Sequence, residues 1–384
     1  MTDSGHGIDE VLRGAVDAGE LTGVAAAAWT ADGGVYLGAF GDARPGTAMA
    51  TDTLVWVASM TKAVTATAAM QLVERGELTL DEPLGDLVPY LGGIAVLDGF
   101  DDDGSPRLRD PSRPVTLRHL LTHTAGFGYD FADATLLRYV GTRPTPGPGT
   151  IEGFELPLLF DPGDRWSYGV NLDWVGQVLE AVTGERLDTV LAASVLEPLG
   201  MVDTGFARTP AQRLRSADVH LRTEDGLTAI PFELPEDPAF LMGGGGLYST
   251  VEDYLRFTRM LLGRGTLDGA RVLAPETVDL MARNHLGALT ATGWQSVNPI
   301  MTNDVDLTED GPQGWGLSFL INAEPTPEGR SAGSLSWAGL ANTYYWVDHQ
   351  HATTGVFATQ VLPFYDPAAR RAFRAFEAAV QQDR

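Results

Sequence analysis

Residues 55–84, VWVASMTKAVTATAAMQLVERGELTLDEPL, contain the only lysine of the chain, Lys62. The other 25 of its 26 Lys and Arg residues are arginine. From residue 59 to 75 the segment is rich in alanine and carries few charges, and Gly76 follows where a helix would stop. Because it has no wide polar face, this stretch predicts a helix that begins at Ser59 and is buried on most sides.

Ser59 and Lys62 are three residues apart, so a helix would place them on one face, one turn apart. A serine hydroxyl needs a base to become a nucleophile, and burial lowers the pKa of a lysine amine enough for it to act as one. Arginine cannot be deprotonated and could not take this role. At the start of a helix, Ser59 would also lie where free backbone N–H groups stabilise developing negative charge.

Two other interpretations of this stretch remain open. Ser-x-x-Lys is a common pattern, and Lys62 could be an ordinary surface lysine. A Ser-His-Asp triad is conceivable because the chain has seven histidines, His123 and His220 among them. No Gly-x-Ser-x-Gly surrounds any of the thirteen serines, so the sequence does not support a nucleophile elbow of the α/β-hydrolase kind.

Composition limits the classes of function. With 384 residues, 44% of them apolar, the chain can build a large core. A formal charge of −25 disfavours nucleic acid and anionic membrane surfaces as partners. The absence of cysteine excludes disulfides and a thiolate nucleophile. The first thirty residues lack a secretion signal and no apolar run is long enough to span a membrane, so we expect a cytoplasmic protein.

The order of predicted elements indicates an α+β fold. A helix over 7–19 and a hairpin around residues 32–34 open the chain, and strands over 340–364 and a helix over 366–382 close it. Helical segments separated by Pro- and Gly-rich loops lie between them. We therefore predict an α+β domain made of residues 1–85 and 235–384, and a mainly helical inserted domain over 86–234. The acidic run at 101–104 is expected to be a mobile loop.

The histidines do not predict a metal site. His119 and His123 have i, i+4 spacing, but no glutamate follows the first of them as a zincin pattern requires. We expect these two residues to be scaffold, and His349 and His351 to lie in a solvated turn. No metal and no cofactor is predicted.

Beyond Ser59 and Lys62, the chain resembles the serine β-lactamase and penicillin-binding-protein superfamily, and within it the class C β-lactamases and family VIII carboxylesterases. The resemblance covers about 20–365. Besides 55–84, it rests on VTLRHLLTHTAGF (115–127), DPGDRWSYGVNLDWVGQVLEAVTG (161–184), LEPLGMVDTGF (196–206), GGGGLYSTVEDYLRFTRMLL (243–262) and GSLSWAGLANTYYWVD (333–348). It implies an antiparallel sheet flanked by helices, plus the helical insertion.

The family's second motif, Tyr-x-Asn, corresponds to WSYGVN, and the resemblance implies that Tyr168 lies beside the nucleophile. There, a nearby ammonium would favour the phenolate and let it relay a proton. The position two after the tyrosine is Val170, and Asn171 follows one residue later. In β-lactamases that asparagine holds the substrate's side-chain amide, so its displacement disfavours β-lactam recognition.

The third motif, Lys-Thr-Gly or His-x-Gly in the family, corresponds to Trp337, Ala338 and Gly339. Tryptophan supplies no cation for a substrate carboxylate, and it resembles the esterase branch. By analogy Gly339 lets the strand edge approach the substrate, and the backbone N–H groups of Ser59 and Leu340 form the oxyanion hole. Residues expected to line the substrate pocket are Trp337, Gly339, Val170, Tyr129 and Trp315.

Together these features predict a serine hydrolase that cleaves small-molecule carboxylic esters of short to medium acyl chain through an acyl-enzyme on Ser59. Lys62 and Tyr168 would move the protons. Three alternatives remain: a β-lactamase-like amidase or D-aminopeptidase, an acyltransferase that passes the acyl group to an alcohol, and a non-catalytic relative. The sequence does not define the oligomeric state.

Overall fold

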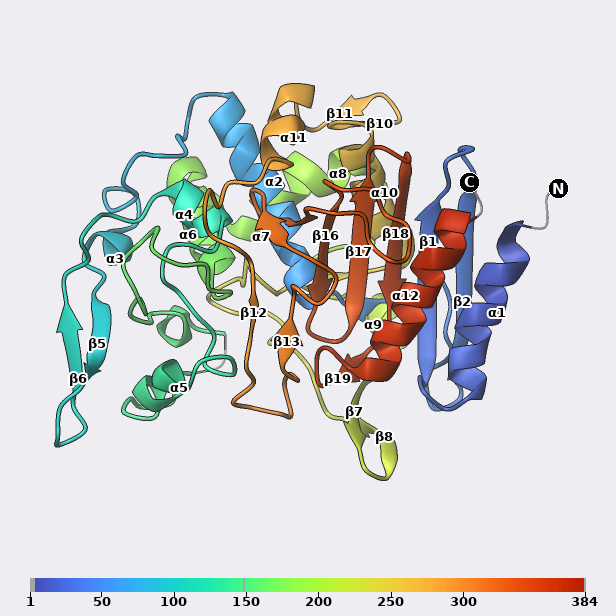
Figure 1. The fold of residues 1–384 in the computed structure, drawn as a ribbon, viewed down its shortest axis with the longest axis horizontal. Coiled ribbons are helices and arrows are strands. Elements are labelled where there is room, and N and C mark those ends of the chain that lie inside the picture. Colours follow the sequence, from blue (N-terminus) through green and yellow to red (C-terminus); the bar gives the residue numbers. More distant parts are fainter. Residues whose placement is uncertain (1–3, 148, 383–384) are drawn as a thin grey trace.

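The computed structural model describes residues 4–147 and 149–382, and its central feature is an antiparallel sheet built from both ends of the chain (Figure 1). Among the described residues this sheet has eight strands in the order β14-β15-β16-β17-β18-β1-β2-β3. Their bounds are β1 (Gly23–Trp29), β2 (Val35–Arg44), β3 (Thr47–Ala48), β14 (Gln313–Trp315), β15 (Leu320–Asn322), β16 (Leu335–Gly339), β17 (Thr343–Asp348) and β18 (Thr353–Ala358). The predicted α+β architecture, an antiparallel sheet flanked by helices, is confirmed.

Helices cover both faces of this sheet (Figure 1). α1 (Ser4–Asp17) and α12 (Pro367–Gln382) pack together on one face, and α10 (Val251–Leu262) packs on the other against β1, β17 and β18. The alanines of β1 explain how both layers approach closely, because Ala25 and Ala27 enter the core on one side while Ala26 and Ala28 enter the core on the other. The helices predicted near the two ends of the chain are α1 and α12, and the predicted hairpin is formed by β1 and β2.

The alanine-rich segment after Ser59 forms α2 (Thr61–Glu74), and eleven of its fourteen residues are buried, as its lack of a polar face predicts. It contacts α6 and α7. The remaining helices and turns are α3 (Pro89–Gly92), α4 (Leu117–Leu121), α5 (Ala134–Val140), α6 (Asn171–Thr183), α7 (Leu187–Leu191), α8 (Glu197–Leu199), α9 (Pro210–Leu214), α11 (Pro275–Met281), the 3₁₀ turns η1 (Ala58–Met60) and η2 (Ile151–Gly153), and the π turn η3 (Ala192–Leu196).

Short strand pairs complete the fold. They are β4 (Val55–Trp56) with β9 (Tyr248–Ser249), β5 (Val96–Phe100) with β6 (Pro106–Arg109), β10 (Thr266–Leu267) with β11 (Ala270–Arg271), β12 (Gly293–Trp294) with β13 (Val305–Asp306), and β7 (Val219–Thr223) with both β8 (Gly226–Ile230) and β19 (Val361–Leu362). β7 and β8 lie in the predicted insertion but join β19 from the C-terminal part. The boundaries at 85/86 and 234/235 stay a prediction.

The acidic run at 101–104, predicted as a loop, connects two paired strands, and its mobility stays a prediction. It is the hydrogen-bonded turn of the β5–β6 hairpin, in which the Asp101 N–H donates to the Ser105 carbonyl and the Gly104 N–H donates to the Asp101 carbonyl. The hairpin was not predicted from the sequence, because its strands carry charges and a proline instead of an apolar alternation.

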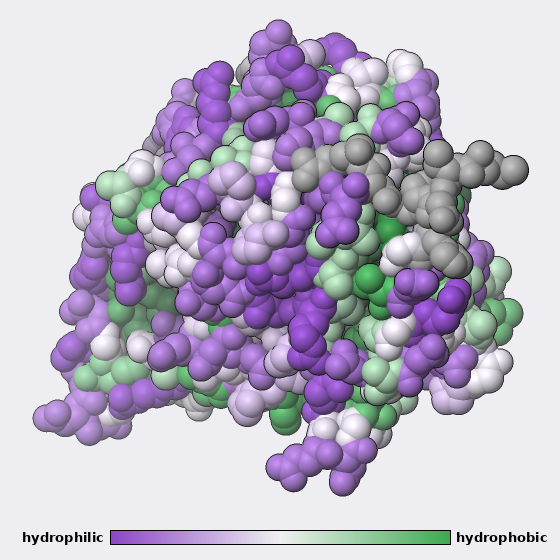
Figure 2. All heavy atoms as spheres, turned by 45° about the vertical axis from the view of Figure 1, so that its right-hand side comes forward, coloured by the Kyte–Doolittle hydropathy of each residue, from purple (hydrophilic) through white to green (hydrophobic). Residues whose placement is uncertain are grey.

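The face of the molecule seen in Figure 2 is covered largely by hydrophilic residues, in keeping with the formal charge of −25. No helix in residues 4–147 or 149–382 is long and apolar enough to cross a membrane.

Candidate active site

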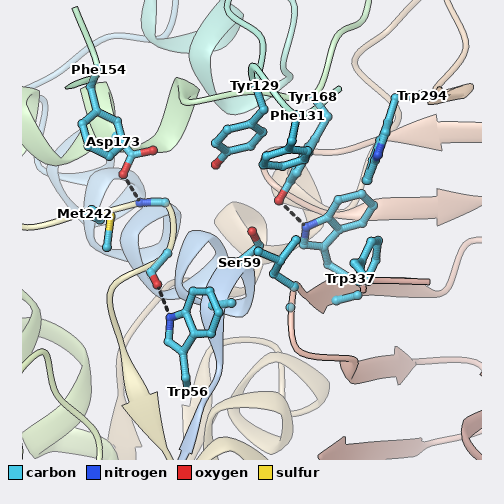
Figure 3. Close-up of a pocket in the computed structure, with 17 residues that line it drawn as sticks. Trp56, Ser59, Tyr129, Phe131, Phe154, Tyr168, Asp173, Met242, Trp294 and Trp337 are labelled. Atoms are coloured by element: carbon cyan, nitrogen blue, oxygen red, sulfur yellow. Dashed lines mark hydrogen bonds between the residues drawn. The ribbon is translucent and has the colours of Figure 1, made fainter. Parts of the chain in front are cut away.

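Ser59 lies in η1, the 3₁₀ turn immediately before α2, and is half-buried. Ala58 precedes it with a φ of 45°, a left-handed conformation that costs a non-glycine residue about 1 kcal/mol or more. The Tyr254 hydroxyl fixes this turn from α10 by donating to the Met60 carbonyl at 2.8 Å. The predicted helix start is thus a strained turn that presents the Ser59 hydroxyl to a cavity (Figure 3).

Lys62 is 1% exposed, and its ammonium has three acceptors within hydrogen-bond distance. Nζ lies 3.1 Å from the Ser59 Oγ, 3.0 Å from the Tyr129 hydroxyl and 2.6 Å from the Gly244 carbonyl oxygen. An ammonium has three protons, one for each partner. After losing one, the amine can still donate to Tyr129 and Gly244 while its lone pair faces Ser59.

Burial lowers the pKa of Lys62 to about 7, and the negative charge of Asp173 opposes this shift. Burial also raises the pKa of Asp173 to about 6, against the opposite pull of Lys62 and of the Gly244 N–H. Neutral and charged forms of Lys62 are therefore both accessible near pH 7, which a general base requires.

A single residue, Gly244, connects Asp173 to Lys62. The Gly244 N–H donates to the Asp173 Oδ1 at 2.9 Å, and the carbonyl of the same residue accepts from Lys62. A Cβ at Gly244 would lie 2.4 Å from the Asp173 Oδ2, so any larger residue there would displace the carboxylate. Thr65 of α2 also holds the backbone next to Gly244 in place, because its hydroxyl donates to the Gly243 carbonyl at 2.7 Å. Asp173 is buried at the start of α6 and lines the cavity.

Tyr168 lies beside Ser59, but its phenol differs from the expected phenolate. Burial raises its pKa, and hydrogen bonds with Ser59 and Trp337 only partly offset this. The Trp337 indole N–H donates to the Tyr168 hydroxyl at 3.0 Å, while Lys62 Nζ lies over the Tyr168 ring, 4.8 Å from its centroid. The ammonium thus does not contact the phenol oxygen, and Tyr168 is a neutral phenol able to donate a proton.

The segment that follows Tyr168 turns away from the cavity. The buried Asn171 amide nitrogen lies 2.8 Å from the His123 Nδ1, and the His123 ring packs against Tyr168 with centroids 4.7 Å apart. Burial, together with Lys62, holds the pKa of His123 well below its ordinary value, so the imidazole is neutral. His123 supports Tyr168 from behind, as the scaffold prediction requires.

Three further histidines also have structural contacts. His119 caps α4 with Thr116, the His349 ring nitrogen contacts the Leu261 carbonyl, and the His351 ring pairs with Asp348. No group of three His, Cys, Asp or Glu residues in the described part of the chain is arranged to hold a metal ion.

The third-motif strand, β16, packs directly against η1. A Cβ at Gly339 would lie 2.3 Å from the Val57 carbonyl oxygen and 2.2 Å from the Thr343 hydroxyl oxygen. The protein's own packing thus requires the absence of a side chain at residue 339. Leu340 lies just beyond the ladder between β16 and β17, and Ser59 lies in the first turn of η1, so neither N–H belongs to a regular hydrogen-bond pattern.

The cavity around Ser59 contains about 650 Å³ of space, counting its open mouth. None of its seventeen lining residues is Lys, Arg or His, and aromatic rings dominate (Figure 3). Besides Ser59, the lining consists of Trp56, Ala58, Tyr129, Phe131, Phe154, Tyr168, Asp173, Met242, Gly244, Gly245, Trp294, Trp337, Ala338, Gly339, Leu340 and Phe364.

Two residues predicted to line the pocket do not line this cavity. Trp315 is fully buried behind Trp337, with ring centroids 4.7 Å apart, and donates to the Leu121 carbonyl. Val170 is buried at the N-terminus of α6 and borders a different cavity. Both predictions are wrong for this cavity, because the backbone of a strand or of a helix start fixes which way a side chain points, and no sequence pattern assigned that direction.

Sequence reasoning also missed several lining residues, Asp173 and Trp294 above all. Trp294 stacks on Tyr168 with ring centroids 5.3 Å apart and an interplanar angle of 11°. It comes from the short β12–β13 pair, which has no sequence signature. Asp173 did carry a signal, since a carboxylate five residues after the motif tyrosine and inside an apolar helix start is an unusual choice.

Comparison with known proteins shows the family of the chain. The family model described as Beta-lactamase matches residues 8–380, and the chain therefore belongs to the β-lactamase family. Among curated relatives, the lovastatin esterase of Penicillium rubens is 33% identical over 377 residues and 93% of both chains. The monacolin J acid methylbutanoyltransferase of Aspergillus terreus is 34% identical, over 86% of this chain and 82% of its own.

Solved structures give the same result. A mutant of simvastatin synthase (LovD) from Aspergillus terreus superimposes with a TM-score of 0.85 at 30% identity, covering 99% of this chain and 95% of its own. EstCE1, described as a hydrolase with promiscuous acyltransferase activity, gives a TM-score of 0.78 at 25% identity over 98% of both chains. The chain is thus placed among the β-lactamase-fold serine hydrolases and acyltransferases.

Replacing Asp173 by asparagine is expected to move the acidic limb of the pH–rate profile to lower pH. The substitution keeps an acceptor for the Gly244 N–H but removes the negative charge that raises the pKa of Lys62. The measurement is kcat/KM for a chromogenic ester between pH 5 and 9. Asp188→Asn, at a half-buried acid on α7 outside the cavity lining, is the control. A lower rate with an unmoved limb would mean that Asp173 only supports the fold.

Proposed function

We propose that this protein cleaves neutral carboxylic esters through a covalent acyl-enzyme on Ser59. The observation that carries the proposal is the 3.1 Å contact between the Ser59 hydroxyl and a buried lysine whose pKa is about 7, at the floor of an aromatic cavity. A nucleophile beside a matched base is the arrangement that acyl transfer requires.

In the first step, the Ser59 Oγ attacks the ester carbonyl carbon while its proton passes to the neutral Lys62 amine. The new bond places negative charge on the carbonyl oxygen, which the N–H groups of Ser59 and Leu340 would stabilise. When the tetrahedral intermediate collapses, the bond to the alcohol oxygen breaks. That oxygen takes a proton from the Tyr168 phenol, the Lys62 ammonium gives up the proton it received to restore that phenol, and the acyl group stays on Ser59.

In the second step a water molecule, or an alcohol, attacks the acyl carbon. Its proton moves through Tyr168 and Lys62 in the reverse of the direction used in the first step. The Ser59 oxygen leaves and is reprotonated, so the enzyme returns to its starting state. The neutral Tyr168 phenol fits the role of acid in the first step, because an acid that protonates an alkoxide has to hold its proton at working pH.

The cavity lining favours neutral, apolar substrates over β-lactams. No cation lines it to pair with a carboxylate, and the third-motif position holds Trp337, whose N–H is occupied by Tyr168. Asn171, the residue nearest to the family's substrate-binding asparagine, points to His123 and not into the cavity. A charged β-lactam would therefore lose its carboxylate and amide partners.

Transfer of the acyl group to an alcohol is the second candidate. The two curated relatives are an esterase and an acyltransferase by name, and EstCE1 is described as having both activities. An aromatic cavity also concentrates an apolar alcohol near the acyl-enzyme more than it concentrates water.

The test is a set of initial rates on p-nitrophenyl acetate and butyrate beside nitrocefin, with and without added 1-butanol. We expect rapid ester cleavage, nitrocefin turnover slower by at least about a hundredfold, a difference of roughly 3 kcal/mol, and butyl ester formation at butanol concentrations far below that of water. Butyl ester formation would establish transfer, and its absence would leave hydrolysis alone. Nitrocefin turnover as fast as that of the esters would contradict the substrate class.

The pH dependence of ester cleavage is expected to have its acidic limb near pH 7. Only the neutral Lys62 amine accepts the serine proton, and burial lowers its pKa to about 7. Below that pH the ammonium dominates, so kcat/KM should fall about tenfold per pH unit, whereas above it the rate should level off. A profile that stays flat down to pH 5 would show that Lys62 is not the base.

A further inference from the structure

A second cavity adjoins the catalytic one and shares two of its walls, Phe154 and Met242. We refer to it as the side chamber. No charged residue is among the described residues that line it, and most of its lining is apolar. The residues that define it are Phe206, Leu234, Pro235, Pro238, Phe240 and Leu241.

Phe154 and Met242 form the partition between the two spaces. Both side chains are half-buried, and the Phe154 ring packs against the Phe240 ring with centroids 4.7 Å apart. Phe154 follows η2, a 3₁₀ helix of one turn, and its backbone N–H donates to the Ile151 carbonyl. A change of rotamer at these two side chains would widen the connection between the cavities.

The position of Tyr168 indicates which part of a substrate would reach the side chamber. The leaving alcohol takes a proton from Tyr168, so the alcohol portion of the ester lies on the side of Tyr168, Trp294 and Trp337. Figure 3 shows Phe154 and Met242 on the opposite side of Ser59. The acyl portion therefore extends toward the partition.

We propose that the side chamber binds the far end of an apolar acyl chain, so that the enzyme prefers medium-length or bulky acyl groups to acetate. The inference rests on the proposed ester cleavage. Continuity with the catalytic cavity, an uncharged lining and a location on the acyl side of Ser59 support it. A chain with a charged end would lose its hydration there without gaining a partner.

The test uses p-nitrophenyl acetate, butyrate and octanoate with the wild type and Leu234→Trp. Leu234 is half-buried and lines the side chamber but not the catalytic cavity, so a larger side chain there fills the chamber. Each methylene removed from water is worth roughly a fourfold gain in binding. We expect the octanoate-to-acetate ratio of kcat/KM to fall about tenfold, the equivalent of losing one or two buried methylenes. Leu108→Trp, at an exposed leucine of β6, is the control.

An unchanged ratio in folded Leu234→Trp, in an enzyme that cleaves esters, would overturn the inference and leave the proposed function standing. Failure of the wild type to cleave any of the three esters would overturn both. Should Leu234→Trp not fold, Leu234→Phe fills less of the chamber and decides in its place, with an expected fall of about threefold, the equivalent of roughly one methylene.

Discussion

Ser59→Ala is expected to lower kcat/KM for p-nitrophenyl butyrate by at least about ten-thousandfold, because loss of a nucleophile removes the covalent route and leaves only binding and the oxyanion donors. The hydroxyl is the one group on η1 that faces both Lys62 and the cavity. The change deletes a single oxygen from a half-buried site, so the fold should be retained.

The control for this variant is Ser336→Ala. Ser336 lies on β16 next to Trp337, outside the lining of the catalytic cavity. Its activity should match that of the wild type. A Ser59→Ala enzyme that kept a tenth of its activity would show that another nucleophile, or direct attack by water, carries the reaction.

Lys62→Arg and Lys62→Met are expected to lower kcat/KM by about a hundredfold to ten-thousandfold, the usual contribution of a general base. Arginine keeps the positive charge but cannot accept the serine proton. Methionine keeps most of the volume of a side chain that is 1% exposed, and so separates loss of the base from a packing defect. The measurement is kcat/KM at pH 8, together with the thermal midpoint of each variant.

Lys62→Met at wild-type activity would exclude Lys62 as the base. Loss of activity in Lys62→Arg alone would point to crowding, since the longer guanidinium has to fit among Ser59, Tyr129 and Gly244. Equal losses in both variants, with thermal midpoints close to that of the wild type, are the expected result.

The parts of the fold that the sequence predicted are those set by local pattern. The alanine-rich stretch after Ser59 predicts the buried α2, and the aromatic and β-branched runs near the C-terminus predict β17 and β18. The β5–β6 hairpin was missed because β6 lies at the surface and neither strand shows an apolar alternation.

In the candidate site, too, features set by local spacing were predicted and features set by the tertiary fold were not. Spacing alone brought Ser59 and Lys62 to one side of a helix start, and the structure places them in contact. The link from Asp173 through Gly244 to Lys62 joins residues 71 and 182 positions apart, a pairing that only the tertiary fold creates. Whether Tyr168 is ionised was equally beyond the sequence, because burial and the Trp337 N–H decide it.

The most direct test of the acyl-enzyme is mass spectrometry of the protein quenched in acid during turnover of p-nitrophenyl butyrate. We predict that the wild type gains the mass of one butyryl group, that peptide mapping places it on Ser59, and that Ser59→Ala gains none. A butyryl group on another residue, or equal labelling of Ser59→Ala, would contradict a covalent mechanism through Ser59.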